Sequence, residues 1–81
     1  MNDRMDELIG EILKERRKEL NYSMQDIANF MKTSKTTVHN WEKGISSMNI
    51  STIIKVCGFL RTDYIKVLER AEKEYYGSDK I

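Results

Sequence analysis

The amino-acid sequence predicts an all-α protein built from five helices. Its 81 residues include no proline, so no pyrrolidine ring interrupts a helical pattern. Apolar residues recur three and four positions apart and do not alternate with polar ones, which is the period of helices and not of strands. A chain of this length has room for one core, so we expect a single domain over residues 1–81.

Two helices are predicted in the first part of the chain. The first, at residues 5–20, carries an apolar stripe and ends at Asn21, a residue that tolerates the left-handed backbone conformation found after many helices. The second begins after Ser23, which can cap it together with Asp26 three residues on. Residues 32–34, Lys-Thr-Ser, then break the pattern, because threonine and serine side chains bond to nearby backbone groups.

The third predicted helix is short and covers residues 35–43. A cap at Thr33 or Ser34 begins it. Val38 and Trp41 lie three residues apart and therefore share one face, which we expect to point inward. This places Trp41 in the core and leaves the polar side chains of the helix outside.

Two further helices complete the predicted fold. Asn49 can cap the fourth, and Thr62 or Asp63 can cap the fifth, which ends at Gly77. We expect the tail, residues 78–81, to fray. The predicted apolar stripes consist of Ile50, Ile53, Ile54, Cys57 and Leu60 in the fourth helix, and of Tyr64, Ile65, Leu68, Ala71 and Tyr75 in the fifth.

The composition argues against an enzyme, a metalloprotein and a membrane protein. A single cysteine, Cys57, allows no disulfide within the chain, and a single histidine, His39, allows no Cys/His zinc cluster. No paired carboxylates, nucleophile–base pair or phosphate-binding glycine loop is present, so we expect no catalytic residues, cofactor or small-molecule substrate. No apolar run approaches the roughly 20 residues that span a bilayer, and the first residues lack the layout of a signal peptide. We therefore expect a cytoplasmic protein.

The distribution of charge is more informative than its sum. The net charge is only +1. Residues 1–13 hold four acidic side chains against one arginine, whereas residues 32–43 hold three lysines against one glutamate. Positive charge gathered around the third helix favours contact with phosphates.

The segment from Ser23 to Gly44 has the dimensions of a unit that reads DNA. Two short helices joined by a three-residue turn suit the major groove, which is about 12 Å wide and admits one helix. Ala28 is small enough for the two helices to pass close together. The third helix carries side chains able to hydrogen-bond to base edges or phosphates: Lys35, Thr36, Thr37, His39 and Asn40.

The sequence resembles the lambda-repressor-like (Cro/cI-type, XRE) helix-turn-helix regulators over about residues 9–68. Four segments carry the resemblance in the family's order: Ile9-Gly-Glu-Ile-Leu-Lys-Glu-Arg-Arg17, Ser23-Met-Gln-Asp-Ile-Ala28, Ser34-Lys-Thr-Thr-Val-His-Asn-Trp-Glu-Lys-Gly44 and Ile53-Ile-Lys-Val-Cys-Gly-Phe-Leu60. The resemblance implies a compact five-helix domain that binds double-stranded DNA and regulates transcription, with the third helix as recognition helix. It also implies an ion pair between Arg17 and Glu42 that ties the first helix to the third.

The same resemblance implies which residues contact DNA. Base contacts fall on Lys35, Thr36 and Asn40. Met24 stands where the family has a phosphate-binding glutamine, for which neighbouring Gln25 is a substitute. Lys32 replaces the usual turn glycine, so a residue with a side chain must adopt positive φ there. The expected phosphate contacts are Gln25, Lys32, Ser34, Thr37, His39, Lys43, Ser46 and Ser47.

The fifth helix continues past the point near Leu68 at which a five-helix unit closes. We expect its extension, within residues 62–81, to form a surface for a twin subunit. A two-fold dimer would place two recognition helices in successive major grooves, about 34 Å apart, on a palindromic operator, as a repressor does. The alternative is an antitoxin or other interaction module that binds a partner protein as well as DNA. The candidates for the dimer surface are Ile65, Leu68, Ala71, Tyr75 and Tyr76.

Overall fold

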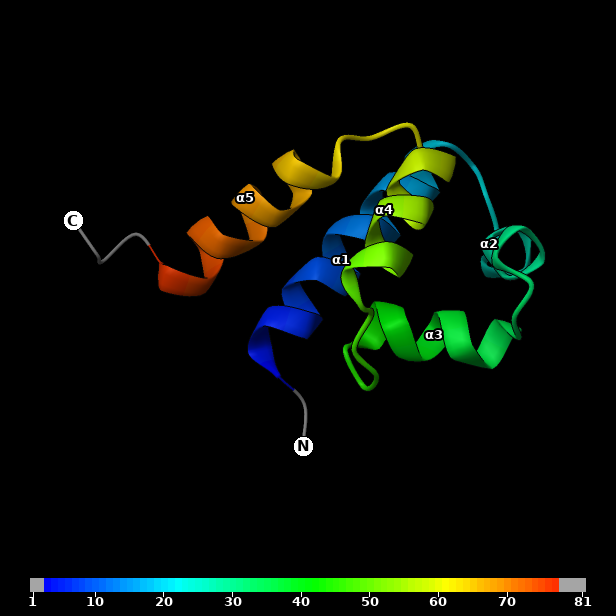
Figure 1. The fold of residues 1–81 in the computed structure, drawn as a ribbon, viewed down its shortest axis with the longest axis horizontal. Coiled ribbons are helices and arrows are strands. Elements are labelled where there is room, and N and C mark those ends of the chain that lie inside the picture. The colour runs from blue at the N-terminus through cyan, green and yellow to red at the C-terminus, as the bar shows by residue number, and fades with distance from the viewer. Residues whose placement is uncertain (1–2, 78–81) are drawn as a thin grey trace.

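The computed structural model describes residues 3–77, and this part of the chain contains five helices and no strand (Figure 1). The predicted bounds agree with the observed ones to within about a residue, and the predicted tail at residues 78–81 lies outside the described residues. No helix between residues 3 and 77 is long and apolar enough to cross a membrane. The helices are α1 (Arg4–Glu19), α2 (Met24–Met31), α3 (Lys35–Lys43), α4 (Ile50–Phe59) and α5 (Tyr64–Tyr76).

Every helix begins at a side chain that accepts a hydrogen bond from the backbone of its first turn. In α2 the cap is reciprocal: Asp26 N donates to Ser23 Oγ at 3.1 Å, and Ser23 N donates to Asp26 Oδ2 at 2.8 Å. Where the sequence left two candidates, Ser34 caps α3 and Asp63 caps α5. These caps satisfy backbone donors that a helix cannot satisfy itself. The five N-caps are Asp3, Ser23, Ser34, Asn49 and Asp63.

The first four helices end in one shared backbone arrangement. A residue with positive φ follows each helix, and the N–H of the next residue donates to a carbonyl five positions earlier, as in the Schellman motif. Only one of the four residues is a glycine, Gly44. Lys32 adopts φ of 57°, which confirms the predicted left-handed turn, and Arg61 adopts φ of 56°, which the sequence did not indicate. Asn21 completes the set with φ of 61°.

The core draws buried apolar side chains from all five helices. Ala28 of α2 and Val38 of α3 are both buried in the core, and Trp41 is half-buried and packs against it. Cys57 is buried on the inner face of α4. The buried apolar residues are Leu8, Ile9, Ile12, Leu13, Ile27, Ala28, Val38, Ile53, Val56, Cys57, Leu60, Val67 and Ala71.

The predicted stripe of α4 is wrong at two positions. Ile50 and Ile54 are exposed, and Val56 is buried in their place. The buried positions of α4 are 53, 56, 57 and 60, which follow the i, i+3, i+4, i+7 spacing of a single helical face. Position 50 and position 54 flank that face and point away from it.

The predicted stripe of α5 also needs correction. Val67, which the sequence analysis omitted, is buried, whereas Ile65 and Tyr75 are exposed. Ala71 is fully buried within the subunit. It packs in the core of its own chain and is therefore not available as a contact with a twin subunit. The error arose because α5 presents one flank to α1 and leaves the adjacent flank uncovered.

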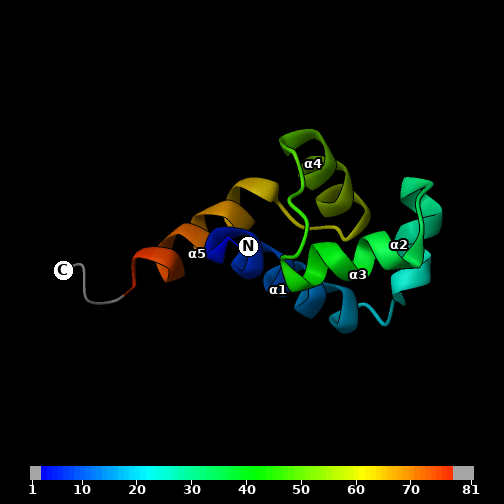
Figure 2. The same cartoon turned by 90° about the horizontal axis from the view of Figure 1, so that it is seen from below.

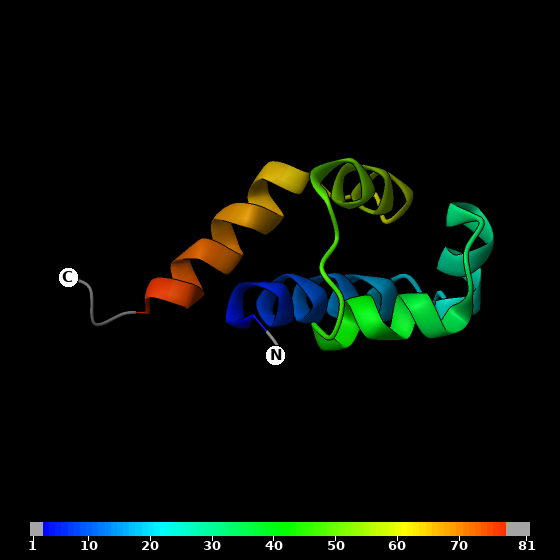
Figure 3. The same cartoon turned by 60° about the horizontal axis from the view of Figure 1, so that its bottom comes forward.

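Helix α1 lies at the centre of the arrangement. It contacts α3 along one side and α5 along another, while α2 contacts both α3 and α4. In Figure 2 α3 runs alongside α1, and in Figure 3 α4 is drawn above these two helices. The C-terminal turns of α5 extend beyond the other helices in all three views.

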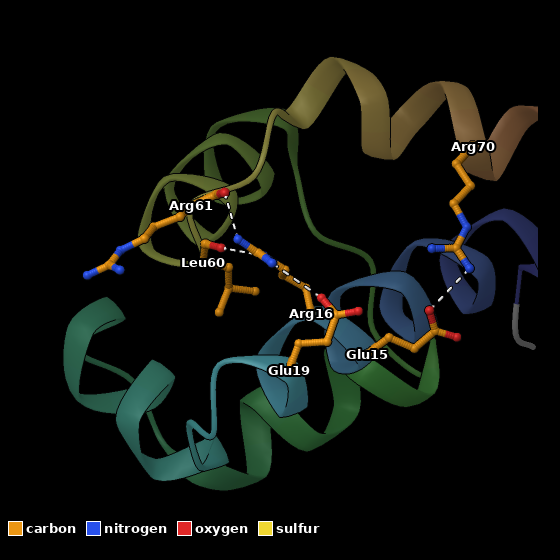
Figure 4. Close-up of polar contacts among 6 residues, drawn as sticks. All are labelled: Glu15, Arg16, Glu19, Leu60, Arg61 and Arg70. Atoms are coloured by element: carbon orange, nitrogen blue, oxygen red, sulfur yellow. Dashed lines mark hydrogen bonds and ion pairs between the residues drawn. The ribbon is translucent and has the colours of Figure 1, made fainter.

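Polar contacts fix the corner between α4 and α5 to α1 (Figure 4). Arg16 Nε donates to the Leu60 carbonyl at 2.8 Å, and Arg16 Nη2 donates to the Arg61 carbonyl at 3.0 Å. Further along, Arg70 Nη2 lies 3.1 Å from Glu15 Oε1. Consecutive residues of α1 thus bind the α4–α5 corner and α5 itself.

Candidate nucleic-acid interface

Helices α2 and α3 are joined by the predicted short turn and pack directly on each other. The left-handed residue Lys32 reverses the chain after α2, and Ser34 begins α3 two residues later. Ala28 of α2 has no exposed surface, Val38 of α3 is 1% exposed, and both belong to one buried cluster. A larger residue at position 28 would push α3 away, because a packed interior has no spare volume.

Gly10 permits an unusually close approach of α1 to α3. A Cβ atom added at Gly10 would lie 2.3 Å from the Trp41 carbonyl oxygen and 2.7 Å from that of Glu42. Both are backbone atoms, which cannot swing aside as a flexible side chain would. The position of α3 therefore depends on the absence of a side chain at Gly10. The sequence analysis overlooked this residue; its signal was a glycine placed inside a strongly helical segment.

A buried ion pair holds α3 from the same side. Arg17 Nε donates to Glu42 Oε2 at 2.7 Å, and Arg17 Nη2 donates to Glu42 Oε1 at 3.0 Å. The remaining arm, Nη1, donates to the Tyr22 carbonyl at 2.9 Å. This is the pair that the family resemblance implies, and both side chains are largely removed from water. Its two parallel bonds set the rotation of α3 as well as its distance from α1.

The outer surface of α3 is polar and open. Lys35, Thr36 and His39 are exposed, and Asn40 is half-buried. Thr37 is half-buried as well and belongs to the cap, since its N–H donates to Ser34 Oγ at 3.1 Å. A short helix with a fixed back and a free polar front can be inserted into a groove without being remodelled.

The start of α2 differs from the family pattern in a way that the structure explains. Met24 is half-buried and packs against the core, so its side chain is directed inward. Gln25 is exposed, and its Nε2 donates to Asn29 Oδ1 at 2.9 Å. The exposed amide is therefore available at position 25 and not at position 24. Lys32 is exposed on the turn that follows.

The opposite end of α3 has an acidic neighbour. Lys43 and Ser47 are exposed, and Ser46 is half-buried. The Ser47 hydroxyl donates a hydrogen bond to the Asp6 carboxylate, which belongs to the first turns of α1. The sequence analysis noted the negative charge of this segment but gave no sign that it lies beside the connection between α3 and α4.

Comparison with known families decides the class of protein. The model of the helix-turn-helix family HTH_3 matches residues 13–66, which include α2, the turn, α3 and α4. The chain belongs to this family. It is accordingly a DNA-binding transcription regulator and not an enzyme. Among curated protein sequences, none matches the chain.

Solved structures of other regulators share the fold. The clp gene regulator ClgR from C. glutamicum superposes with a TM-score of 0.78 at 20% identity, over 84% of this chain and 88% of that one. The biofilm master regulator SinR, solved in complex with DNA, gives 0.67 at 26% identity, over 74% and 97%. A variant of the restriction-modification controller protein C.Esp1396I gives 0.78 at 18% identity, over 98% and 100%. The last likeness therefore includes the extension of α5.

Proposed function

We propose that this helix-turn-helix protein is a repressor that binds a palindromic operator as a homodimer, with α3 of each subunit in a major groove. The observation that carries the proposal is the contrast between the two faces of α3. Its back is fixed by Gly10 and by the Arg17–Glu42 pair, and its front presents exposed polar side chains. The complex of SinR with DNA supports the DNA-binding part of the proposal.

Three side chains of α3 are proposed to read bases. Lys35 can donate to O6 and N7 of guanine, and the amide of Asn40 can pair with N6 and N7 of adenine. The methyl group of Thr36 suits the methyl group of thymine. Lys35 and Thr36 are exposed in the first turn of α3, and this end of a recognition helix is the one that meets base edges.

The phosphate contacts are proposed around the rim of this surface. They supply affinity and register without reading sequence. The exposed cations Lys32 and Lys43 lie at opposite ends of α3, so the two would contact phosphates on either side of the groove. Binding should weaken steeply with salt, because each neutralised phosphate releases counterions. The proposed contacts are Gln25, Lys32, Ser34, Thr37, His39, Lys43, Ser46 and Ser47.

The homodimer is proposed to form on the uncovered flank of α5. Ile65 and Tyr76 are 50% and 55% exposed, and they share one face of α5 because they are about three helical turns apart. Two large, exposed side chains on one face indicate a surface that can be covered. Together with Leu68 they line a groove of about 380 Å³ whose other wall is Met5 and Ile9 of α1, and Glu69 and Glu72 also line it. A second copy would bring the same apolar surface to this groove. Tyr75, also exposed, would lie at its edge.

Selection of bound duplexes from a random pool tests the proposal. The wild-type chain should select a palindrome. Lys35→Ala and Asn40→Ala should each relax the preference at one position of the half-site, because a good bidentate base contact contributes about 1–3 kcal/mol of discrimination. Selection of no palindrome, together with unchanged sites for both variants, would overturn the assignment.

Sedimentation equilibrium separates the homodimer from the alternative. A dimer at tens of micromolar is expected, and Ile65→Glu should convert it to a monomer that remains folded. A monomeric wild-type chain that co-purifies with a different protein would instead favour an antitoxin or similar module. In either case we place the protein with the operator DNA, in the cytoplasm of a bacterium or phage-infected host and associated with the nucleoid.

A further inference from the structure

The first turns of α1 lie against the connection that follows α3. The start of α1 and the end of α3 are neighbours in Figure 1 and Figure 3. A Cβ atom added at Gly44 would lie 2.6 Å from Glu7 Cγ and 2.7 Å from Glu7 Cα. The backbone at Gly44 therefore lies directly against Glu7, with no room for a side chain between the two segments.

Within this contact a carboxylate accepts the hydrogen bond of a serine hydroxyl. Ser47 donates its hydrogen bond to Asp6 Oδ2. A hydroxyl has one proton to donate, and an ionised carboxylate can only accept. While Asp6 accepts this hydrogen bond, Ser47 cannot donate to a phosphate oxygen. The carboxylate thus takes the place that an anionic phosphate oxygen would take.

The charge of Asp6 acts in the same direction. Phosphates supply most of the sequence-independent attraction between proteins and DNA. A phosphate that approached Ser47 would come within a few ångströms of the Asp6 carboxylate, and the two negative charges would repel each other. Around neighbouring Lys43, one shallow pocket is lined by the carboxylates of Glu7, Glu11 and Glu42 and by the cations Arg4 and Lys14. Those charges offset one another, so the effect on Ser47 is assigned to Asp6, the carboxylate that is bonded to it.

We propose that Asp6 restrains DNA binding by holding the Ser47 hydroxyl and repelling the phosphate that would contact it. The inference rests on the proposed phosphate contact of Ser47. Because phosphate contacts do not depend on base sequence, the restraint lowers the affinity for operator and non-operator duplexes by the same factor. Asp6 thereby sets the overall affinity of the regulator without changing the site that it selects.

A purely structural role of Asp6 has the opposite consequence. If the bond served to order residues 44–47 for DNA, then removing the charge of Asp6 would loosen that segment and weaken binding. If Asp6 restrains binding, the same change strengthens it. The sign of the effect of one substitution therefore distinguishes the two roles.

Asp6→Asn is the decisive variant, because it keeps the shape of the side chain and removes its charge. Glu11→Gln is the matched control: it removes the same charge from the same helix at a residue with no bond to Ser47. Ser47→Ala is made in the wild-type chain and in Asp6→Asn. Affinities are measured on the selected operator and on a random duplex, at about 50 and 200 mM salt, and thermal melting verifies that each variant is folded.

Asp6→Asn should bind both duplexes about three- to tenfold more tightly at the lower salt, with a smaller gain at the higher salt. Glu11→Gln should change affinity by less than about twofold. Ser47→Ala should have little effect alone and should remove part of the gain in the Asp6→Asn chain. Unchanged or weaker binding by Asp6→Asn would overturn this inference and leave the proposed function standing. Failure of the wild-type chain to bind any duplex would instead overturn the proposed function, and the restraint with it.

Discussion

Arg17 and Glu42 form a buried bidentate ion pair that joins α1 to α3, with N–O distances of 2.7 and 3.0 Å. Replacing Arg17 by Gln leaves the Glu42 carboxylate in the interior without its partner. Breaking a buried pair from one side costs about 3–5 kcal/mol. Urea unfolding of Arg17→Gln should show a loss of this size, and binding to the operator should weaken because α3 is no longer fixed.

The exposed pair between Arg70 and Glu15 is the matched control. Its side chains are about half-exposed, and exposed pairs contribute about 1 kcal/mol or less. Arg70→Gln should therefore cost much less than Arg17→Gln. Equal losses for the two variants would mean that the buried pair does not have the special role assigned to it.

Replacing a helical glycine by alanine should have opposite effects on stability at Gly10 and at Gly58. Gly10→Ala places a methyl group against the backbone of α3, so α1 and α3 must separate, at a cost of about 1–3 kcal/mol. Gly58 has no atom within 4 Å of an added Cβ and lies on the exposed side of α4. Gly58→Ala should stabilise by about 0.5–1 kcal/mol, because alanine is the better helix former. Thermal unfolding of both variants checks the signs.

The same two variants should also differ in their affinity for DNA. Gly10→Ala should weaken operator binding beyond its effect on stability, since α3 moves relative to α2. Gly58→Ala should leave affinity unchanged. A Gly10→Ala chain with wild-type stability and affinity would show that α1 and α3 are not in the close contact described.

A comparison of Lys32 with Arg61 distinguishes the effect of positive φ on stability from the effect of a phosphate contact on DNA binding. Both have side chains at positive φ, a conformation that glycine adopts with less strain. Lys32→Gly and Arg61→Gly should each stabilise the fold by up to about 1 kcal/mol. Only Lys32→Gly should weaken DNA binding, with a shallower salt dependence, because only Lys32 is a proposed phosphate contact. Equal affinities for the two variants would remove Lys32 from the interface.

Because Cys57 is buried, we expect the free energy of unfolding to fall at alkaline pH. Burial, with a smaller contribution from the charge of Asp63, raises the pKa of the Cys57 thiol from 9.0 to about 11. Below pH 9.0 the thiol is protonated in both states, so stability is not affected. Between pH 9.0 and about 11 the unfolded chain loses the proton first, which favours unfolding.

The difference in unfolding free energy between wild type and Cys57→Ala isolates this effect from other groups that titrate at high pH. The difference should shrink as the pH rises through that range. A difference that is constant with pH would mean that the thiol ionises equally in both states. An alkylating reagent should also modify Cys57 only after unfolding, since the side chain is 1% exposed.

The local structure could be predicted from the sequence because short-range chemistry determines it. Ser23, Ser34 and Asn49 cap the helices that they were expected to cap, and Lys32 adopts the predicted positive φ. Each of these features depends on a few neighbouring residues. The Arg17–Glu42 pair is different: it joins residues far apart in the chain, and only the resemblance to a family indicated it.

The faces of α4 and α5 could not be predicted as well, because apolar residues occur on more than one side of each helix. Ile54 and Val56 are both apolar and differ only in which side the rest of the chain covers. Gly10 and Asp6 were missed for a related reason. Both residues contact residues 41–47. The sequence of α1 by itself does not indicate which part of the chain packs against it.

The most direct test of the central claim is the titration of an isotope-labelled chain with the selected operator, followed through the backbone amide signals. If α3 reads DNA, the largest shifts should fall on residues 32–40 of the turn and α3, with smaller ones at Gln25 and residues 43–47. The exposed surface of α4 around Ile54 should be unaffected. Shifts concentrated on α4 or α5, with α3 unchanged, would contradict the account.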